Sequence, residues 1–294
     1  MKARLGGTVD GLKLVSAGRE IQIVIERRGP ASAPMWLLLP ALSTVSSRSE
    51  WKAFAESIGE QCQLVSFDWP GFGDSDRPPI RYDATLLRQA LQAVLNHLKH
   101  DRQEPITLVA AGHSASIALG LASDCSKQWK QLVLVAPTWR GPLPTMTRWH
   151  PKHFGWVRQL VSTPLIGPVL YRLNTSRAIL KLMLRRHVWV DRNLLTPTRV
   201  REQQRLSRQR GSRFASVSFV SGGLDPAGDR NWWLEQAKQL HCPWHVVLAM
   251  EAPPRSSHEM ELLAEHADKV SRINGRLGLH QEFGADLSEQ LLSA

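Results

Sequence analysis

Strand-like and helix-like runs alternate along the first 137 residues, and this alternation constrains the fold more than any other feature. Apolar runs with the length of buried strands occupy residues 21–26, 35–40, 62–69, 106–112 and 131–137. Runs with apolar residues at helical spacing lie between them, at 49–61, 84–98 and 114–125. Strands that are apolar almost throughout are buried on both faces. The pattern therefore predicts an α/β domain with a mostly parallel sheet and helices on both faces.

The alternation stops near residue 142, where proline and glycine recur and basic helices follow to about residue 213. No strand-like run occurs in this segment. The alternation then resumes, with expected helices or strands at 230–240, 243–250, 256–266, 268–274 and 285–294. The simplest organisation is one core domain, residues 1–141 and 214–294, interrupted by a helical lid at 142–213.

The strongest chemical signal is the pentapeptide Gly112-His113-Ser114-Ala115-Ser116 between a predicted strand and a small-residue helix. A G-x-S-x-G stretch in that position forms a nucleophile elbow, a tight turn that presents a serine above the sheet. Here serine replaces the last glycine and is still small. The helix that follows Ser114 would favour developing negative charge at its N-terminus. The other interpretation is a strand–turn–helix unit that uses small residues only for packing.

With these features the chain resembles the α/β-hydrolase superfamily. The stretch from Asp68 to Pro78, DWPGFGDSDRP, is similar to the loop that follows the fourth strand in that superfamily. PALSTVSSRSEW, residues 40–51, resembles a branch associated with photosynthetic organisms. The resemblance implies a serine hydrolase, with Ser114 as the nucleophile and the backbone amides of Leu42 and Ala115 as the oxyanion hole. Pro40 and Ala41 replace the usual His-Gly of the family. This change of side chains is compatible with an oxyanion hole, because its donors are backbone amides.

A serine nucleophile needs a base, and the base needs an acid to orient it. The family places the base five residues before a glutamate, and that position is Leu277 before Glu282. His280 lies three residues further on, in a loop that contains Gly275 and Gly278. It is either a displaced base or a histidine that packs locally.

The acid is expected just after the strand at 243–250, where the sequence is MEAPPR with no aspartate. Asp225, in GGLDPAGD, lies where the chain returns to the core domain. The sequence Gly-Leu-Asp-Pro is also typical of an ordinary turn, in which the aspartate has no catalytic role. Glu251 is the other possible acid. We therefore expect Ser114, His280 and Asp225 as the catalytic set, with Glu251 as the alternative acid.

The positive charge of the protein is concentrated in the predicted lid. Residues 142–213 contain 15 Lys and Arg against two acids, a net of +13, whereas the whole chain has a net charge of +11. Basic residues recur at helical spacing at 177, 181 and 185, and at 201, 205 and 208. Basic amphipathic helices are typical of membrane-surface or anionic-ligand contacts. We expect an apolar pocket under the lid and contact with an anionic membrane outside it. We do not expect nucleic acid as a partner, because the sequence contains no known module for binding it.

Two functions from different classes follow. The first is hydrolysis of an ester or lipid-like small molecule through an acyl-enzyme on Ser114. The second is a pseudo-hydrolase that binds an apolar or amphipathic ligand, a partner or an anionic membrane without turnover.

No motif for a cofactor or metal is present, so none is expected. Widely spaced Cys62, Cys125 and Cys242 predict packed thiols, and the N-terminus lacks a signal-peptide core, which favours a cytoplasmic protein or one peripheral at a membrane.

Overall fold

The computed structural model describes residues 2–100, 104–124, 128–226 and 229–293. Eight strands form one sheet in the order β1-β2-β4-β3-β5-β6-β7-β8. Strand β2 pairs antiparallel with both of its neighbours, and all pairs from β4 to β8 are parallel. The strands are β1 (Thr8–Ser16), β2 (Arg19–Arg28), β3 (Met35–Leu39), β4 (Gln63–Phe67), β5 (Ile106–Ala111), β6 (Trp129–Val135), β7 (Trp244–Ala249) and β8 (Lys269–Ile273). The predicted fold class, an α/β fold with a mostly parallel sheet, is confirmed.

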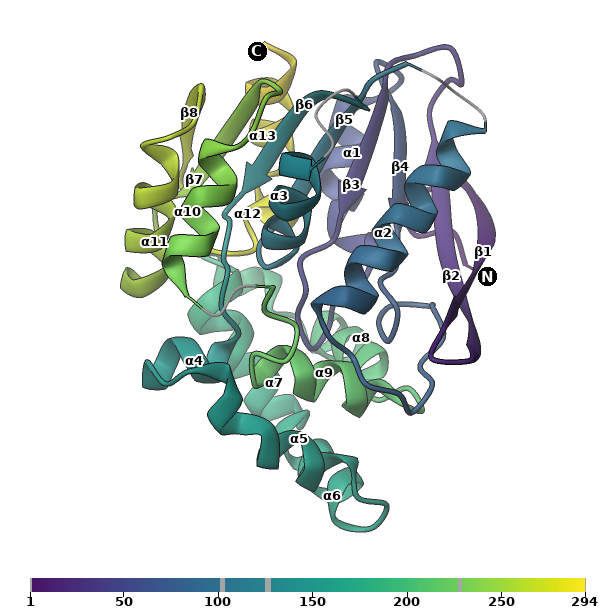
Figure 1. The fold of residues 1–294 in the computed structure, drawn as a ribbon, viewed down its shortest axis with the longest axis vertical. Helices are drawn as coiled ribbons and strands as arrows, with labels where there is room; N and C mark the ends of the chain where they lie inside the picture. Colours follow the sequence, from purple (N-terminus) through teal and green to yellow (C-terminus); the bar gives the residue numbers. More distant parts are fainter. Residues whose placement is uncertain (1, 101–103, 125–127, 227–228, 294) are drawn as a thin grey trace.

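Helices cover both faces of the sheet (Figure 1). One face carries α2 (Ala84–Lys99), α3 (Ser114–Asp124), α10 (Arg230–Lys238) and α11 (Pro254–Ala264). The other face carries α1 (Lys52–Ile58), α12 (Leu279–Glu282) and α13 (Gly284–Leu292), which pack against one another. The central strands β3, β4, β5 and β7 are buried at every residue, as expected for strands between two helical layers.

The sequence pattern missed strand β1. Its residues are mostly exposed or partly buried because β1 is the edge strand of the sheet, and Leu14 is its one buried residue. A two-residue turn joins it to β2, with Ala17 at φ +50° and Gly18 at φ +69°. Such left-handed pairs match the twist of a hairpin. The register then pairs Ser16 with Arg19.

Between β6 and β7 the chain forms a group of helices that we call the cap, residues 142–220. It lies beyond the carboxyl ends of the parallel strands (Figure 1). Helix α9 spans the boundary predicted at residue 213. The cap consists of α4 (Pro142–Thr147), a 3-10 turn (Pro151–Phe154), α5 (Gly155–Ser162), α6 (Ile166–Asn174), α7 (Arg177–Met183), a π turn (Leu184–Val188), a 3-10 turn (Arg192–Leu194), α8 (Pro197–Ser207) and α9 (Ser212–Val220).

Two of the three cysteines, Cys62 and Cys242, are buried free thiols, as predicted; Cys125 lies outside the described residues. Burial raises the pKa of both thiols. In the described part of the chain, every helix is too short or too polar to cross a bilayer.

Candidate functional site

The turn after β5 places a glycine where a nucleophile elbow presents its reactive side chain. Gly112 follows the last strand residue directly and has φ +54°. A Cβ built on Gly112 would lie 3.0 Å from the Cβ of Ala41, on the loop after β3. A side chain at position 112 would therefore face the loop predicted to supply the oxyanion hole. The strained strand-to-helix position of an elbow is the one that exposes its nucleophile, and in this chain it carries no side chain.

Ser114 lies two residues beyond this position and is the first residue of α3. Its side chain is 0% exposed. The hydroxyl donates to the carbonyl oxygen of Ala111 at 2.7 Å and lies 3.3 Å from that of Leu39. It thus points back between the ends of β3 and β5 and not into a site. Gly112 thus lies at the centre of the tight turn formed by the small residues from Ala110 to Ser114, and Ser114 lies two positions beyond it.

The predicted oxyanion donors have different roles in the structure. The Ala115 amide donates to the carbonyl oxygen of Gly112 at 3.2 Å and so belongs to the first turn of α3. Leu42 lies on the loop after β3, with its side chain buried in the core. The preceding amide, that of Ala41, donates to Glu50 Oε2 at 2.8 Å. In this conformation the amides of Ala41 and Ala115 therefore already have acceptors within the protein.

His280 forms a buried pair with Glu50. Its Nε2 lies 3.2 Å from Glu50 Oε2, and its ring packs on Trp51 with centroids 4.8 Å apart. Burial raises the pKa of the Glu50 carboxyl, and the hydrogen bond to His280 opposes that rise. Because Glu50 also accepts from the amides of Ala41 and Ser47, the pair holds the loop after β3 in place. His280 therefore braces this loop and does not contact the Ser114 hydroxyl.

Asp225 is paired with the residue beside the serine. Its Oδ1 lies 3.2 Å from His113 Nε2, and both side chains are buried. The ring nitrogen is not aligned well enough for a hydrogen bond. Oδ1 also accepts from the Gly141 amide at 2.9 Å, and the His113 ring packs edge-on against Phe219 of α9. Asp225 and His113 thus join the β5 turn to the start and end of the cap.

The loop after β8, where the base was expected, is bound to the cap. The amides of Leu277 and Gly278 donate to the carbonyl oxygens of His187 and Val188, each at 3.1 Å. Arg276 donates to the Trp189 carbonyl at 3.2 Å and lies 3.9 Å from Glu251. The alternative acid Glu251 therefore faces a guanidinium. The loop thus brings an arginine and a leucine to this edge of the sheet in place of an imidazole.

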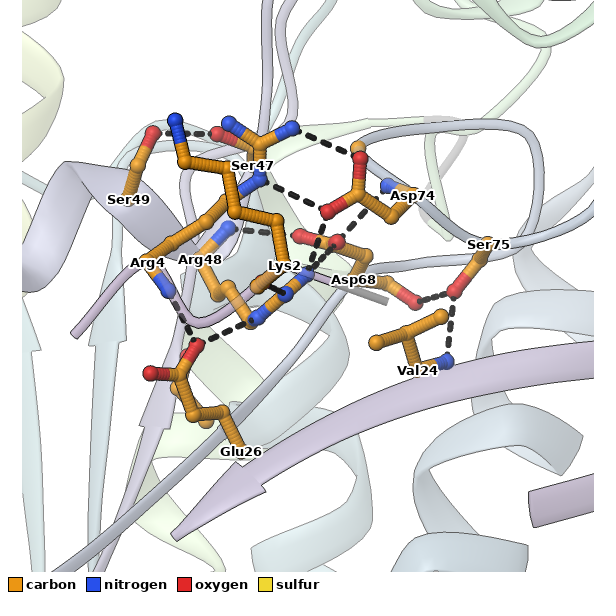
Figure 2. Close-up of polar contacts among 12 residues, drawn as sticks. Lys2, Arg4, Val24, Glu26, Ser47, Arg48, Ser49, Asp68, Asp74 and Ser75 are labelled. Atoms are coloured by element: carbon orange, nitrogen blue, oxygen red, sulfur yellow. Dashed lines mark hydrogen bonds and ion pairs between the residues drawn. The ribbon is translucent and has the colours of Figure 1, made fainter. Parts of the chain in front are cut away.

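A buried ionic cluster, which the sequence did not predict, joins Arg48 on the loop after β3 to carboxylates of β2 and of the loop after β4 (Figure 2). Arg48 is completely buried; its Nε donates to Glu26 at 2.8 Å, and its Nη1 contacts Asp68 and Asp74. Arg4 adds a two-bond contact to Asp74 at 2.6 and 2.8 Å. The sequence signal was present, because Asp68 and Asp74 belong to the hydrolase-like loop. Their partners are far away along the chain.

Charge and backbone amides balance the carboxylates of this cluster. Burial raises the pKa of Asp68, and the Arg48 guanidinium is the main opposing influence. Burial alone would also raise the pKa of Asp74, but Arg4 and Arg48 hold it below its usual range. Gly73, at φ +54°, lets the chain turn against Asp68, since a Cβ there would lie 2.0 Å from the Asp68 Cγ. The cluster therefore fixes the loops after β3 and β4 relative to each other.

Two small pockets in the described residues lie away from the β5 turn. The lining of one includes Met35 and Leu98, and the lining of the other includes Met250 and Met260. Among the described residues, no group of His, Cys, Asp and Glu is arranged to hold a metal ion.

The chain belongs to the alpha/beta hydrolase family, whose model matches residues 35–275. Similar structures include a hydrolase from Pseudomonas aeruginosa (16% identity, TM-score 0.72, 97% of each chain). A haloalkane dehalogenase variant from Agrobacterium tumefaciens is 15% identical, with a TM-score of 0.72 over 100% of this chain and 99% of that one. The enol-lactonase from Burkholderia xenovorans is 15% identical, with a TM-score of 0.69 over 96% and 98%. At these identities the likeness establishes the fold. No curated protein matches the chain.

Proposed function

We propose that this chain is a hydrolase-fold binding protein that does not catalyse acyl transfer. The observation that carries the proposal is the glycine at the left-handed position of the β5 turn. In an elbow of this kind the side chain at that position attacks the substrate. Gly112 has no group that could attack, and a Cβ at that position would face Ala41, the loop on which an oxyanion would be held.

The surroundings of the Ser114 hydroxyl and of His280 support the same conclusion. General-base catalysis requires an imidazole or carboxylate within about 3 Å of the proton that it removes, directly or through one water. The hydroxyl of Ser114 is bonded to main-chain carbonyl oxygens, and His280 is bonded to Glu50. Arg276 lies on the loop where the base was expected, and a guanidinium remains protonated near neutral pH.

The competing function is ester or lipid hydrolysis through an acyl-enzyme on Ser114. The observation in its favour is that Ser114 begins α3, where the helix dipole stabilises negative charge. For this chemistry the serine would have to leave two carbonyl oxygens, and the β5 turn would have to rebuild around it. In the binding protein, an ester or lipid-like molecule is a ligand that is held without turnover.

Labelling with a fluorophosphonate probe distinguishes the two functions. Wild type, Ser114→Ala and His280→Ala would be treated beside an active serine hydrolase as the positive control, with circular dichroism to establish that each sample is folded. We expect no labelling of folded wild type. Labelling that disappears in Ser114→Ala would overturn the proposal in favour of the acyl-enzyme. Loss of that labelling in His280→Ala as well would identify His280 as the base.

A further inference from the structure

Helix α6 packs one face against the cap and exposes the opposite face to solvent. Gly167 packs so closely on α5 that a Cβ would lie 2.1 Å from the Val161 carbonyl oxygen. One turn later Tyr171 is buried, and its hydroxyl donates to the Ser207 carbonyl oxygen at 2.8 Å. Residues on the packed face therefore recur every four positions, and the other face of the same helix points away from the cap.

The exposed face consists of large aliphatic side chains. Leu165, Val169 and Leu173, spaced four apart, are 83%, 59% and 62% exposed. Further exposed apolar residues on α6 and α7 are Ile166, Leu170, Ile179, Leu182 and Met183. Large aliphatic side chains that are exposed on successive turns of a helix, as at Leu165, Val169 and Leu173, mark an interaction site in a folded protein. We call these eight residues the apolar tip.

The same two helices carry exposed positive charge that no carboxylate neutralises. Arg172 lies on α6, and Arg177 and Lys181 lie on α7. The cap has 15 Lys and Arg against Asp191 and Glu202. In the described part of the cap, no Lys or Arg lies within 4.0 Å of a carboxylate, although ion pairs are frequent in the core domain.

The α6 part of the apolar tip lies at the end of the molecule that is farthest from the sheet. Figure 1 shows α5 and α6 extending beyond the other cap helices along the longest axis of the molecule. The sheet and its covering helices therefore do not obstruct the approach of a flat surface to the tip.

We propose that the apolar tip and its surrounding cations dock on the surface of an anionic phospholipid bilayer. Aliphatic side chains flanked by Lys and Arg match the interface, where the former enter the acyl boundary and the latter meet acidic headgroups. A second copy of the chain would bring one strongly positive cap against another. A nucleic acid would use the cations and leave the aliphatic face in water. The docking is independent of the proposed function, since it involves no residue of the β5 turn.

Vesicle flotation of the full chain tests the proposal. The vesicles are phosphatidylcholine alone, or phosphatidylcholine with about 30% phosphatidylglycerol, at about 0.15 M salt. We expect binding to the mixed vesicles only. The apolar variant Leu165→Ser/Val169→Ser/Leu173→Ser should bind at least about tenfold more weakly. The charge variant Arg172→Gln/Lys181→Gln should lose roughly fivefold per charge.

The matched controls lie on strand β1, which is not part of the cap. Val15→Ser removes an aliphatic that is 71% exposed, and Lys13→Gln removes an exposed cation; both should bind as wild type does. Ser114→Ala should also bind normally, so failure of this proposal and of the proposed function are distinguishable. The docking proposal is overturned by equal binding to both vesicles, by an unaffected apolar variant, or by tighter binding to duplex DNA. An oligomer that the apolar variant abolishes would assign the tip to self-association instead.

Discussion

Replacing Arg48 by methionine tests how the loops at the carboxyl edge are held. The substitution keeps an unbranched side chain of similar length and removes the guanidinium that contacts Glu26, Asp68 and Asp74. Removing one partner of a buried ion pair costs about 3–5 kcal/mol, because it leaves charge buried without a counter-ion. In the variant, Arg4 still donates to Asp74, whereas the remaining donors to Asp68 are backbone amides. We therefore expect the free energy of unfolding at pH 7.5 to fall by about 3–5 kcal/mol.

The deficit of this variant should depend on pH. Arg48 is the main influence that lowers the pKa of Asp68, so its removal leaves burial to raise that pKa further. A carboxyl whose folded-state pKa exceeds its unfolded value gains stability as the pH falls. The difference from wild type should therefore narrow between pH 7.5 and pH 5.

Urea unfolding at the two pH values measures both effects. The control is Lys13→Met, which removes an exposed ion pair with Glu20 at 3.0 Å and should cost under about 1 kcal/mol. If Arg48→Met also lost less than about 1 kcal/mol at pH 7.5, the cluster would not hold the loops as argued.

Three further perturbations test other parts of the structure. Burial lowers the pKa of His245 to about 4, with Lys269 adding to the effect. As the pH falls, His245 therefore becomes protonated in the unfolded chain at a higher pH than in the folded protein. About 1–3 kcal/mol of the free energy of unfolding, present above pH 6.5, should be lost by pH 4. Urea unfolding measures this loss, and His245→Gln should remove it. Gly73→Ala should cost at least about 3 kcal/mol because its Cβ meets Asp68, whereas Gly18→Ala, with open space around it, should cost only about 1 kcal/mol; thermal unfolding compares them, and equal losses would exclude the clash. His280→Ala should lower stability by about 2–4 kcal/mol in the same assay by leaving Glu50 buried without its partner, and a neutral result would show that the pair does not brace the loop.

The sequence by itself determined the layers of this protein. Buried strands can be predicted from continuous apolar runs such as residues 35–40 and 106–112, because a strand between two helical layers has no face toward solvent. The edge strand β1 lacks that signature and was missed. The cationic character of the segment between β6 and β7 could also be read directly, since charge is a property of composition.

Only the tertiary structure decided which side chain occupies the β5 turn. The stretch Gly112 to Ser116 predicts a tight turn, but a shift of two residues in the central position of that turn changes which residue projects. The role of His280 depended on Glu50, which is 230 positions away along the chain. Arg48 gives no local sign of burial, because its partners come from β2 and the loop after β4. Local patterns specify helices, strands and turns, whereas the direction and partners of a polar side chain depend on contacts between distant segments.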